Sequence, residues 1–361
     1  MLRLRDIAFA PLSVAYGAAG RARRALYRAG VLPVERVAAP VVSVGNITAG
    51  GTGKTPLVEW LARAAASEGR RVCILTRGYG RADASKRVVV SDGEHVMAEA
   101  REGGDEPRLL AENLLEHKVA VVSDANRAAA ARWALAHLRS DAFILDDGFQ
   151  HLRLSRDLNI LTLDATDPWG GMKLLPRGRL REPPGELKRA DLIVITRAEL
   201  AVDIEEVRAR AEALSGGRRP VLIARTATLR MKLLAVPHSE LKVRAHEHEI
   251  ESVPQTLAAF CAIGNPQAFF AHARRDGLDI IHARAFTDHH VYTQSDIDLY
   301  VREAVRQGAR ALLTTAKDAV KLRALNFALP CYVLEVALKF DDEQKMRAIL
   351  REALARRLSE L

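Results

Sequence analysis

The sequence predicts an α/β fold with a doubly wound, mostly parallel sheet. Short apolar runs alternate with helical patterns along the chain, as in such folds. The runs are continuously apolar, which is typical of strands that are buried on both faces. Motifs rich in glycine and charge follow these runs, and ligands of such sheets bind beyond the carboxyl ends of the strands. In the first part of the chain we expect strands at 41–44, 71–76, 118–123, 142–146, 158–164, 191–196 and 220–225.

The rhythm of strands and helices changes after Arg225. Two stretches of alternating polarity follow, and this pattern predicts an extended pair that links two domains. A second αβ series then begins, and we expect a cleft between the two domains. Its predicted elements are 257–264, 278–286, 311–322, 331–336 and a closing helix from 341. The predicted parts are an N-terminal basic amphipathic segment (1–35), a core domain (36–225), a β-ribbon linker (226–250) and a smaller C-terminal αβ domain (251–361).

Composition and net charge limit the classes of function that the chain could have. The chain has 361 residues, enough for two domains with their own cores, and a net charge of +9. A basic excess suits nucleic acid, anionic lipid or a phosphorylated substrate. The sequence lacks zinc-finger spacing and aromatic-basic interleaving, so we expect no nucleic-acid partner. No apolar run approaches the ~18 residues that a membrane span needs. Three widely spaced cysteines, Cys73, Cys261 and Cys331, predict buried free thiols and a reducing cytosol.

The N-terminal segment is basic and amphipathic. Residues 1–36 carry seven arginines against two acidic residues, and Pro11 could open a helix. One interpretation is a helix that lies on an anionic membrane surface. The other is a helix packed on the domain with a solvated basic face. The apolar side chains fall on one stripe: Leu12, Tyr16, Ala19 and Leu26.

The run VVSVGNITAGGTGKTP, which starts at Val41, predicts a phosphate-binding loop between a strand and a helix. Its glycines allow successive backbone N–H groups to point at one anion, and the helix N-terminus adds partial positive charge. Lys54 supplies a charge for phosphates, and Thr55 offers a hydroxyl to Mg²⁺. The first position of the usual pattern is glycine, but Thr48 stands there. That position lies at the entry of the loop, where steric demands are looser.

The motif FILDDGFQHL places two carboxylates at a strand end. Asp146 fits the carboxylate that phosphate-loop enzymes place near Mg²⁺. Asp147 doubles the negative charge, which is costly unless a cation lies there. Gln150 and His151 extend the same surface. A pair of helix-capping aspartates is the alternative interpretation.

Two further motifs predict acid–base chemistry. In REGGDEP, Asp105 lies in a tight connection and could accept a proton from an attacking hydroxyl, although most such segments are plain turns. In FTDHH, one of His289 and His290 could orient a base across the cleft, or both could be solvent-facing loop residues. The motif LLPRGRLREP adds alternating arginines that suit phosphate, with Glu182 beside them, or it forms a solvated basic loop.

Taken in order, these motifs resemble one family, the tetraacyldisaccharide 4′-kinases that act in lipid A biosynthesis of Gram-negative bacteria. The resemblance runs from about Val41 to Leu322, and its family also has Thr at the position of Thr48. The motifs that carry it are VGNITAGGTGKTP, TRGYG, GGDEP, SDANR, LDDGFQH, LLPRGRLREP, FTDHH and TTAKDAVK.

The resemblance implies a P-loop NTPase-like fold and an enzyme that uses ATP and Mg²⁺. It implies phosphorylation of the 4′-hydroxyl of a tetraacylated glucosamine disaccharide 1-phosphate, which gives lipid IVA. It also implies a peripheral protein at the cytoplasmic face of the inner membrane, in contact with its anionic surface, and we expect a monomer. Two rival interpretations are a phosphate-loop switch protein and a basic membrane-associated scaffold. The segment TAKD from Thr315 lacks the N-K-x-D spacing of a GTP-dependent switch.

The resemblance also implies roles for single residues. Asp105 would act as the base, paired with His289, and Asp147 would lie in the catalytic site with Lys54. The implied ATP-binding residues are Thr48, Ala49, Gly50, Gly51, Thr52, Gly53, Lys54 and Thr55. The implied metal ligands are Thr55, Asp146 and Glu182. The implied substrate contacts are Arg77, Arg127, Gln150 and Arg181.

Overall fold

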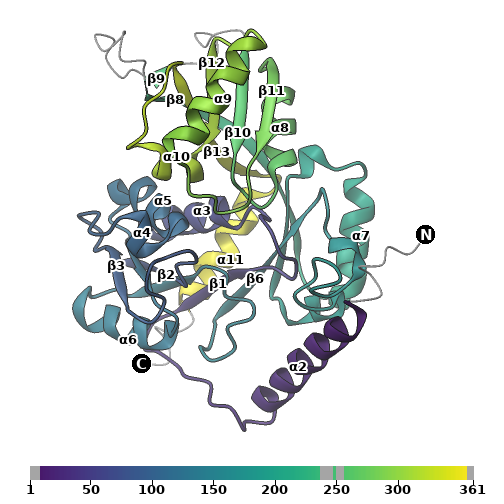
Figure 1. Cartoon of the computed structure of the whole chain (residues 1–361). Coiled ribbons are helices and arrows are strands. Elements are labelled where there is room, and N and C mark those ends of the chain that lie inside the picture. The colour runs from purple at the N-terminus through teal and green to yellow at the C-terminus, as the bar shows by residue number, and fades with distance from the viewer. Residues whose placement is uncertain (1–8, 236–246, 249–255, 356–361) are drawn as a thin grey trace.

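The computed structural model describes residues 9–235, 247–248 and 256–355, and its strands form one long, curved sheet (Figure 1). Along the sheet the strand order is β11-β10-β12-β13-β8-β7-β6-β1-β5-β2-β4-β3, and β9 pairs with β8. The strands are β1 (Val41–Gly45), β2 (Val72–Thr76), β3 (Val88–Ser91), β4 (Ala120–Ser123), β5 (Ala142–Leu145), β6 (Leu158–Asp164), β7 (Leu192–Thr196), β8 (Val221–Ala235), β9 (Glu247–His248), β10 (Leu257–Cys261), β11 (Ile280–Ala285), β12 (Ala311–Thr315) and β13 (Cys331–Phe340).

The first half of the sheet is parallel from β8 to β4, and its seven predicted strands are confirmed. β1 lies between β5 and β6, and all its residues are buried. Neighbouring residues of β1 point to opposite faces, so Val41 joins one core and Val42 the other. Burial on both faces explains why these strands read as continuous apolar runs. The antiparallel edge strand β3 was not predicted, because its short run lies between polar turns.

Helices cover both faces of this half. Over both halves, the α-helices of the described residues are α2 (Ala10–Arg28), α3 (Lys54–Ser67), α4 (Ala100–Gly103), α5 (Asp105–Asn113), α6 (Arg127–His137), α7 (Ile204–Ser215), α8 (Pro266–Arg275), α9 (Gln294–Arg306), α10 (Ala316–Leu322) and α11 (Glu343–Ala355). Three of them show how the first half is covered. α3 and α5 pack on one face through Leu57, Leu61 and Leu110. α6 covers the other face with a row of alanines, which lets it lie close to the sheet.

β8 and β13 join the two halves of the sheet. They are antiparallel and paired over most of their lengths, whereas β13, β12, β10 and β11 are parallel to one another. Both strands are longer than the predicted runs. The predicted 311–322 element divides into β12 and α10 at Thr315, whose side chain caps the helix by accepting from Asp318 N. The expected ribbon at 226–250 is described only in part, as β8 with β9.

The C-terminal helix returns to the first half of the chain. α11 lies beside α3 (Figure 1), and its Met346, Leu350 and Leu354 belong to the same buried cluster as Leu61. The described end of the chain therefore stabilises the core that carries β1. The domain boundaries at residues 35, 225 and 250 stay a prediction.

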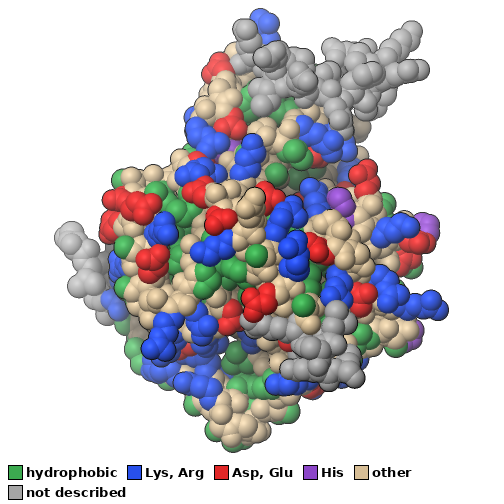
Figure 2. Space-filling model, turned by 180° about the vertical axis from the view of Figure 1, so that it is seen from behind, with side chains coloured by type: hydrophobic (Ala, Val, Ile, Leu, Met, Phe, Trp, Pro, Cys, Tyr) green, Lys and Arg blue, Asp and Glu red, His purple; other side chains and the backbone are tan. Residues whose placement is uncertain are grey.

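α2 turns its apolar stripe to solvent. Leu12, Tyr16 and Leu26 are 56%, 41% and 43% exposed, while the helix contacts the protein through Ser13, Gly17 and Arg24. Among the described helices, none is both long and apolar enough to cross a membrane. On the face shown in Figure 2, Lys and Arg side chains are interspersed with Asp and Glu side chains rather than gathered into one continuous basic patch. The three cysteines are buried and free, as expected.

Candidate active site

The predicted phosphate-binding loop connects β1 to α3. Gly50 and Gly53 have φ values of 105° and 73°, in the left-handed region that favours glycine. A side chain at Gly50 would also lie 2.7 Å from the Arg179 guanidinium. Gly53 is the N-cap of α3, and no side chain caps the helix there. The loop therefore presents an uncapped helix N-terminus, which is an anion-binding feature.

The end of β7 and the connection between β6 and β7 hold the loop, mainly through its carbonyls. Thr196 Oγ1 donates to Thr52 O (2.9 Å), and Arg197 Nη1 donates to Gly51 O (2.8 Å). Arg179 donates to Ala49 O, and Ala49 N donates back to Arg179 O. Because these contacts use mainly carbonyl oxygens, they fix the shape of the loop without occupying most of its N–H groups.

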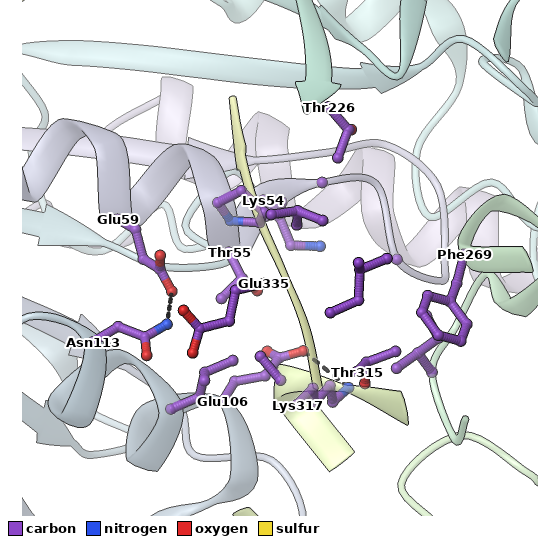
Figure 3. A pocket seen from close by; sticks show the side chains of 18 of the residues that line it. Lys54, Thr55, Glu59, Glu106, Asn113, Thr226, Phe269, Thr315, Lys317 and Glu335 are labelled. Carbon is purple, nitrogen blue, oxygen red and sulfur yellow. Dashed lines mark hydrogen bonds and ion pairs between the residues drawn. The ribbon is translucent and has the colours of Figure 1, made fainter. Parts of the chain in front are cut away.

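The loop opens on a cavity of about 1170 Å³. Lys54 and Thr55 line one side, and Glu106 of α5 and Lys317 of α10 line another (Figure 3). β8 and β13 contribute apolar and polar side chains, and Phe269 of α8 lies at a further wall. The cavity is therefore formed by both halves of the sheet, as the sequence predicted for a cleft.

Asp147 is paired with two cations at the cavity. Its carboxylate lies 3.3 Å from Lys54 Nζ and 2.7 Å from Arg181 Nη1. Burial opposes ionisation, but the charges of Lys54 and Arg181 outweigh it and hold the pKa of Asp147 far below its usual range. The backbone of Asp147 has φ 52°, which is uncommon for a non-glycine residue and occurs often at functional sites.

Asp146 is in the opposite electrostatic state. Its side chain is buried, and Thr76 Oγ1 donates to it at 3.3 Å. Burial raises the pKa of Asp146 to about 7, and the negative charges of Glu106 and Asp147 add to this. A carboxylate with this environment would be stabilised by a bound cation.

Asp105 and His289 come together from the two halves of the chain. Asp105 starts α5 directly after Gly104, which has φ 105°, and its Oδ2 lies 3.4 Å from His289 Nδ1. Lys321 Nζ lies 3.6 Å from the same oxygen. Burial would raise the pKa of Asp105, but the hydrogen bond to His289 and the charge of Lys321 lower it overall. Asp105 is therefore ionised and held in place.

The structure distinguishes the two adjacent histidines. His290 Nε2 contacts Asp296 at 3.2 Å, and its ring stacks on Phe286. His289 instead adopts φ 61°, which turns its ring toward Asp105. The choice that the sequence left open between them is thus made by the backbone of this loop.

Several residues of this site were not predicted from the sequence. Glu106 follows Asp105, and its Oε1 lies 3.0 Å from Lys317 Nζ. Lys317 and Lys321 lie one turn apart on α10 and meet consecutive acidic residues of α5. The i, i+4 spacing of two lysines in TTAKDAVK was a usable signal, because such residues share one face of a helix.

The predicted substrate contacts have different surroundings. Arg127 is buried at the start of α6; its Nη1 donates to Ala125 O, and its Nε has no hydrogen-bond partner among the described residues. Arg77 is exposed beside Tyr79. Gln150 Nε2 donates to Asn46 O (2.8 Å), at the end of β1.

Glu182 is engaged away from these groups. It is 4% exposed, and its Oε2 contacts Arg24 of α2 at 3.3 Å and Arg189 at 2.6 Å. The pair with Arg24 attaches α2 to the connection between β6 and β7. The geometry therefore offers no support for Glu182 as a metal ligand, and that role stays a prediction.

Comparisons with known proteins agree with this geometry. A family model described as tetraacyldisaccharide-1-P 4′-kinase matches residues 5–355. A tetraacyldisaccharide 4′-kinase of Anaeromyxobacter dehalogenans (strain 2CP-C) is 42% identical over 324 residues, which cover 88% of this chain and 82% of that one. One from Chlorobium phaeovibrioides is 37% identical and covers 97% of this chain and 98% of its own.

A solved structure is also similar over nearly its whole length. The crystal structure of LpxK from Aquifex aeolicus in complex with ATP has a TM-score of 0.75 and 29% identity. The match covers 97% of this chain and 99% of that one. The predicted P-loop NTPase-like α/β fold is thereby confirmed. The family match over residues 5–355, together with a relative that is 42% identical over 88% of this chain, shows that the chain belongs to the tetraacyldisaccharide-1-P 4′-kinase family.

Proposed function

We propose that this protein is an ATP-dependent tetraacyldisaccharide 4′-kinase. It transfers the γ-phosphoryl group of ATP to the 4′-hydroxyl of a tetraacylated glucosamine disaccharide 1-phosphate and gives lipid IVA, a step in lipid A biosynthesis. One observation carries the proposal for this chain: the phosphate-binding loop and His289, whose ring contacts Asp105, line the same cavity. A nucleotide and an acceptor hydroxyl could meet there.

The loop residues 48–55 bind the phosphates of ATP. Backbone N–H groups and the N-terminus of α3 supply partial positive charge, and Lys54 supplies a full charge. Lys54 and Arg181 are already held at the cavity by Asp147, so little reorganisation is needed when an anion enters. Phosphoryl transfer depends largely on such positioning and charge stabilisation.

Asp105 accepts the proton of the 4′-hydroxyl. The hydroxyl oxygen forms a bond to the γ-phosphorus, the bond from that phosphorus to the bridging oxygen breaks, and ADP leaves. Asp105 is ionised and its position is fixed by contacts to His289 and Lys321, which are properties that a base requires. His289 orients the carboxylate.

Thr55 and Asp146 are the residues that would hold Mg²⁺. They offer hard oxygen donors, which this ion prefers. Burial raises the pKa of Asp146, the charges of Glu106 and Asp147 add to this, and a bound cation would oppose both effects. When bound, the ion would neutralise charge on the phosphates. The roles of the surrounding side chains do not depend on its exact position.

Arginines and Gln150 bind the lipid substrate. Arg127 is a buried guanidinium with an unused donor, a chemistry that suits a phosphate group. Burial lowers the pKa of Arg127, and the nearby negative charge of Asp147 partly offsets this. Arg77 is exposed and Arg181 lines the cavity, so both could reach an anionic substrate.

α2 places the enzyme on the anionic cytoplasmic face of the inner membrane. Its apolar stripe is exposed while its arginines at 21, 23 and 28 are solvated. An exposed apolar stripe flanked by basic side chains is typical of helices that lie in the membrane interface. The enzyme can then reach the headgroup of a lipid that stays in the bilayer.

Purified protein with labelled ATP and the disaccharide 1-phosphate should form a product that chromatography identifies as the bisphosphate. Lys54→Ala should lower turnover at least ~100-fold, because the negative charge on the phosphoryl group that is transferred loses its positively charged partner. Lys345→Ala, a change at an exposed residue of α11, is the control. Full turnover by Lys54→Ala would remove the loop from the mechanism.

Asp105→Asn should lower kcat by about 10²–10⁴ while the Kd for ATP changes little, because an amide keeps the shape but cannot accept the proton. Turnover kinetics and calorimetric ATP titration separate the two effects. Equal losses in kcat and ATP affinity would instead make Asp105 a binding residue.

Asp146→Asn should stabilise the metal-free protein at pH 8. A pKa raised to about 7 means that the folded state holds a proton that the unfolded state loses near its usual value of 3.8. Stability of the wild type therefore falls as pH rises between these two values. The variant avoids that loss, worth up to about 4 kcal/mol. Denaturant unfolding should show a large difference at pH 8 and a small one at pH 4; a pH-independent difference would contradict this.

Replacing Leu12, Tyr16 and Leu26 together by Ser should weaken binding to anionic vesicles roughly tenfold or more, because the apolar area that enters the interface is lost. Co-sedimentation measures it. Val305→Ser, at an exposed site on α9, is the matched control and should bind normally. Unchanged sedimentation of the triple variant would exclude α2 as the membrane contact.

A further inference from the structure

Lys317 contacts the ring nitrogen of His289 that faces away from Asp105. Its Nζ lies 3.4 Å from His289 Nε2, while His289 Nδ1 lies 3.4 Å from Asp105 Oδ2. The side chain of Lys317 is only 14% exposed and lines the cavity. The three groups therefore form a row that runs from α10 through the His289 loop to α5.

This row determines which ring nitrogen carries the hydrogen. A lysine ammonium has donors and no acceptor. His289 Nε2 must therefore accept from Lys317, which leaves the ring hydrogen on Nδ1. Nδ1 then donates to Asp105. The opposite tautomer would place an N–H against an ammonium and a lone pair against a carboxylate.

We propose that Lys317 is a positioning residue that keeps His289 neutral with its hydrogen on Nδ1. This inference rests on the proposed role of Asp105 as base. The contact with Lys317 lets His289 orient Asp105 by a hydrogen bond from a neutral ring. Asp105 then keeps enough basicity to take the proton of the substrate hydroxyl. A histidine that carried a second proton would be a cation. It would stabilise the negative charge of Asp105 further and so make the carboxylate a weaker base.

The charged groups around the ring support this assignment. Lys317 Nζ is held by Glu106 at 3.0 Å and by Asp288 at 3.4 Å. Asp288 lies 4.0 Å from His289 Nε2, farther than Lys317. On the other side, the charge of Asp105 is shared with Lys321. Burial would lower the pKa of Lys317, but Glu106 and Asp288 raise it overall, so the ammonium stays charged.

Both partners are anchored at Ala262, the residue that follows β10. His289 N donates to Ala262 O at 3.3 Å, and Ala262 N donates to Asp318 Oδ2 at 3.0 Å. Asp318 follows Lys317 in α10 and is fully buried. The end of β10 thus fixes the histidine loop and the helix that carries the lysine relative to each other, as a positioning contact requires.

Nitrogen-15 NMR of histidine-labelled protein tests the tautomer directly. The His289 signal is assigned by its absence in His289→Gln. The wild type should show the hydrogen on Nδ1, and Lys317→Met should show a mixture or the Nε2 form. A wild-type ring with the hydrogen on Nε2 would overturn the proposal without any lysine variant. An unchanged Nδ1 form in folded Lys317→Met would also overturn it.

Lys321→Met is the matched control for charge. It removes an ammonium from the same helix one turn away, at Asp105 rather than at His289. It should reduce activity but leave the tautomer as in the wild type. A tautomer change equal to that of Lys317→Met would show that the net charge of α10, and not the contact, sets the ring state.

Kinetics provide the second test. Lys317→Met should lower kcat about 10–100-fold with a KM for ATP within about threefold of the wild type, and Lys317→Arg should restore part of the loss because it can still donate to Nε2. Equal effects of Met and Arg would contradict the positioning role. The two proposals fail separately: absence of lipid phosphorylation in the wild type would refute the kinase, whereas the NMR result would refute the lysine contact alone.

Discussion

The ion-paired contact between α5 and α10 is the interaction on which the active site depends. Asp105 and Glu106 begin α5 in the first half of the chain, and Lys317 and Lys321 lie on one face of α10 in the second. His289 of the second half contacts Asp105 at the same place. The groups are largely buried, so their attraction is screened less by water than a surface pair would be. The proposed base and the residues proposed to position it therefore come from both halves of the chain.

Charge is distributed unevenly between the two aspartates that follow β5. Asp147 pairs with both Lys54 and Arg181, which holds the two cations in place and leaves a net positive charge that suits phosphate. Asp146, next to Asp147, is buried, and burial together with the charges of Glu106 and Asp147 raises its pKa to about 7, so its carboxylate would be stabilised by a cation. Neighbouring residues of one motif thus have opposite electrostatic roles. Their pKa values are separated by contacts to distant parts of the chain and not by their own sequence.

Much of the fold could be predicted because its signals are local. Continuous apolar runs marked the parallel strands, since strands covered on both faces have no polar side to alternate. The lengths of β8 and β13 could not be predicted, because these strands stabilise each other by antiparallel pairing rather than by burial on both faces. Likewise, nothing in the sequence of α11 indicated that it would return to pack beside α3.

By itself, the sequence determined the phosphate-binding loop, the carboxylates at strand ends and the amphipathic helix, because each depends on residues within one or two turns or strands. The tertiary structure alone decided which distant groups meet. In the structure His289, and not His290, contacts Asp105, and Lys317 lies against the ring of His289. Glu182 pairs with Arg24 and Arg189. The physical reason is that electrostatic partners interact through space. Their distances are set by strand pairing and helix packing, which no short stretch of sequence contains.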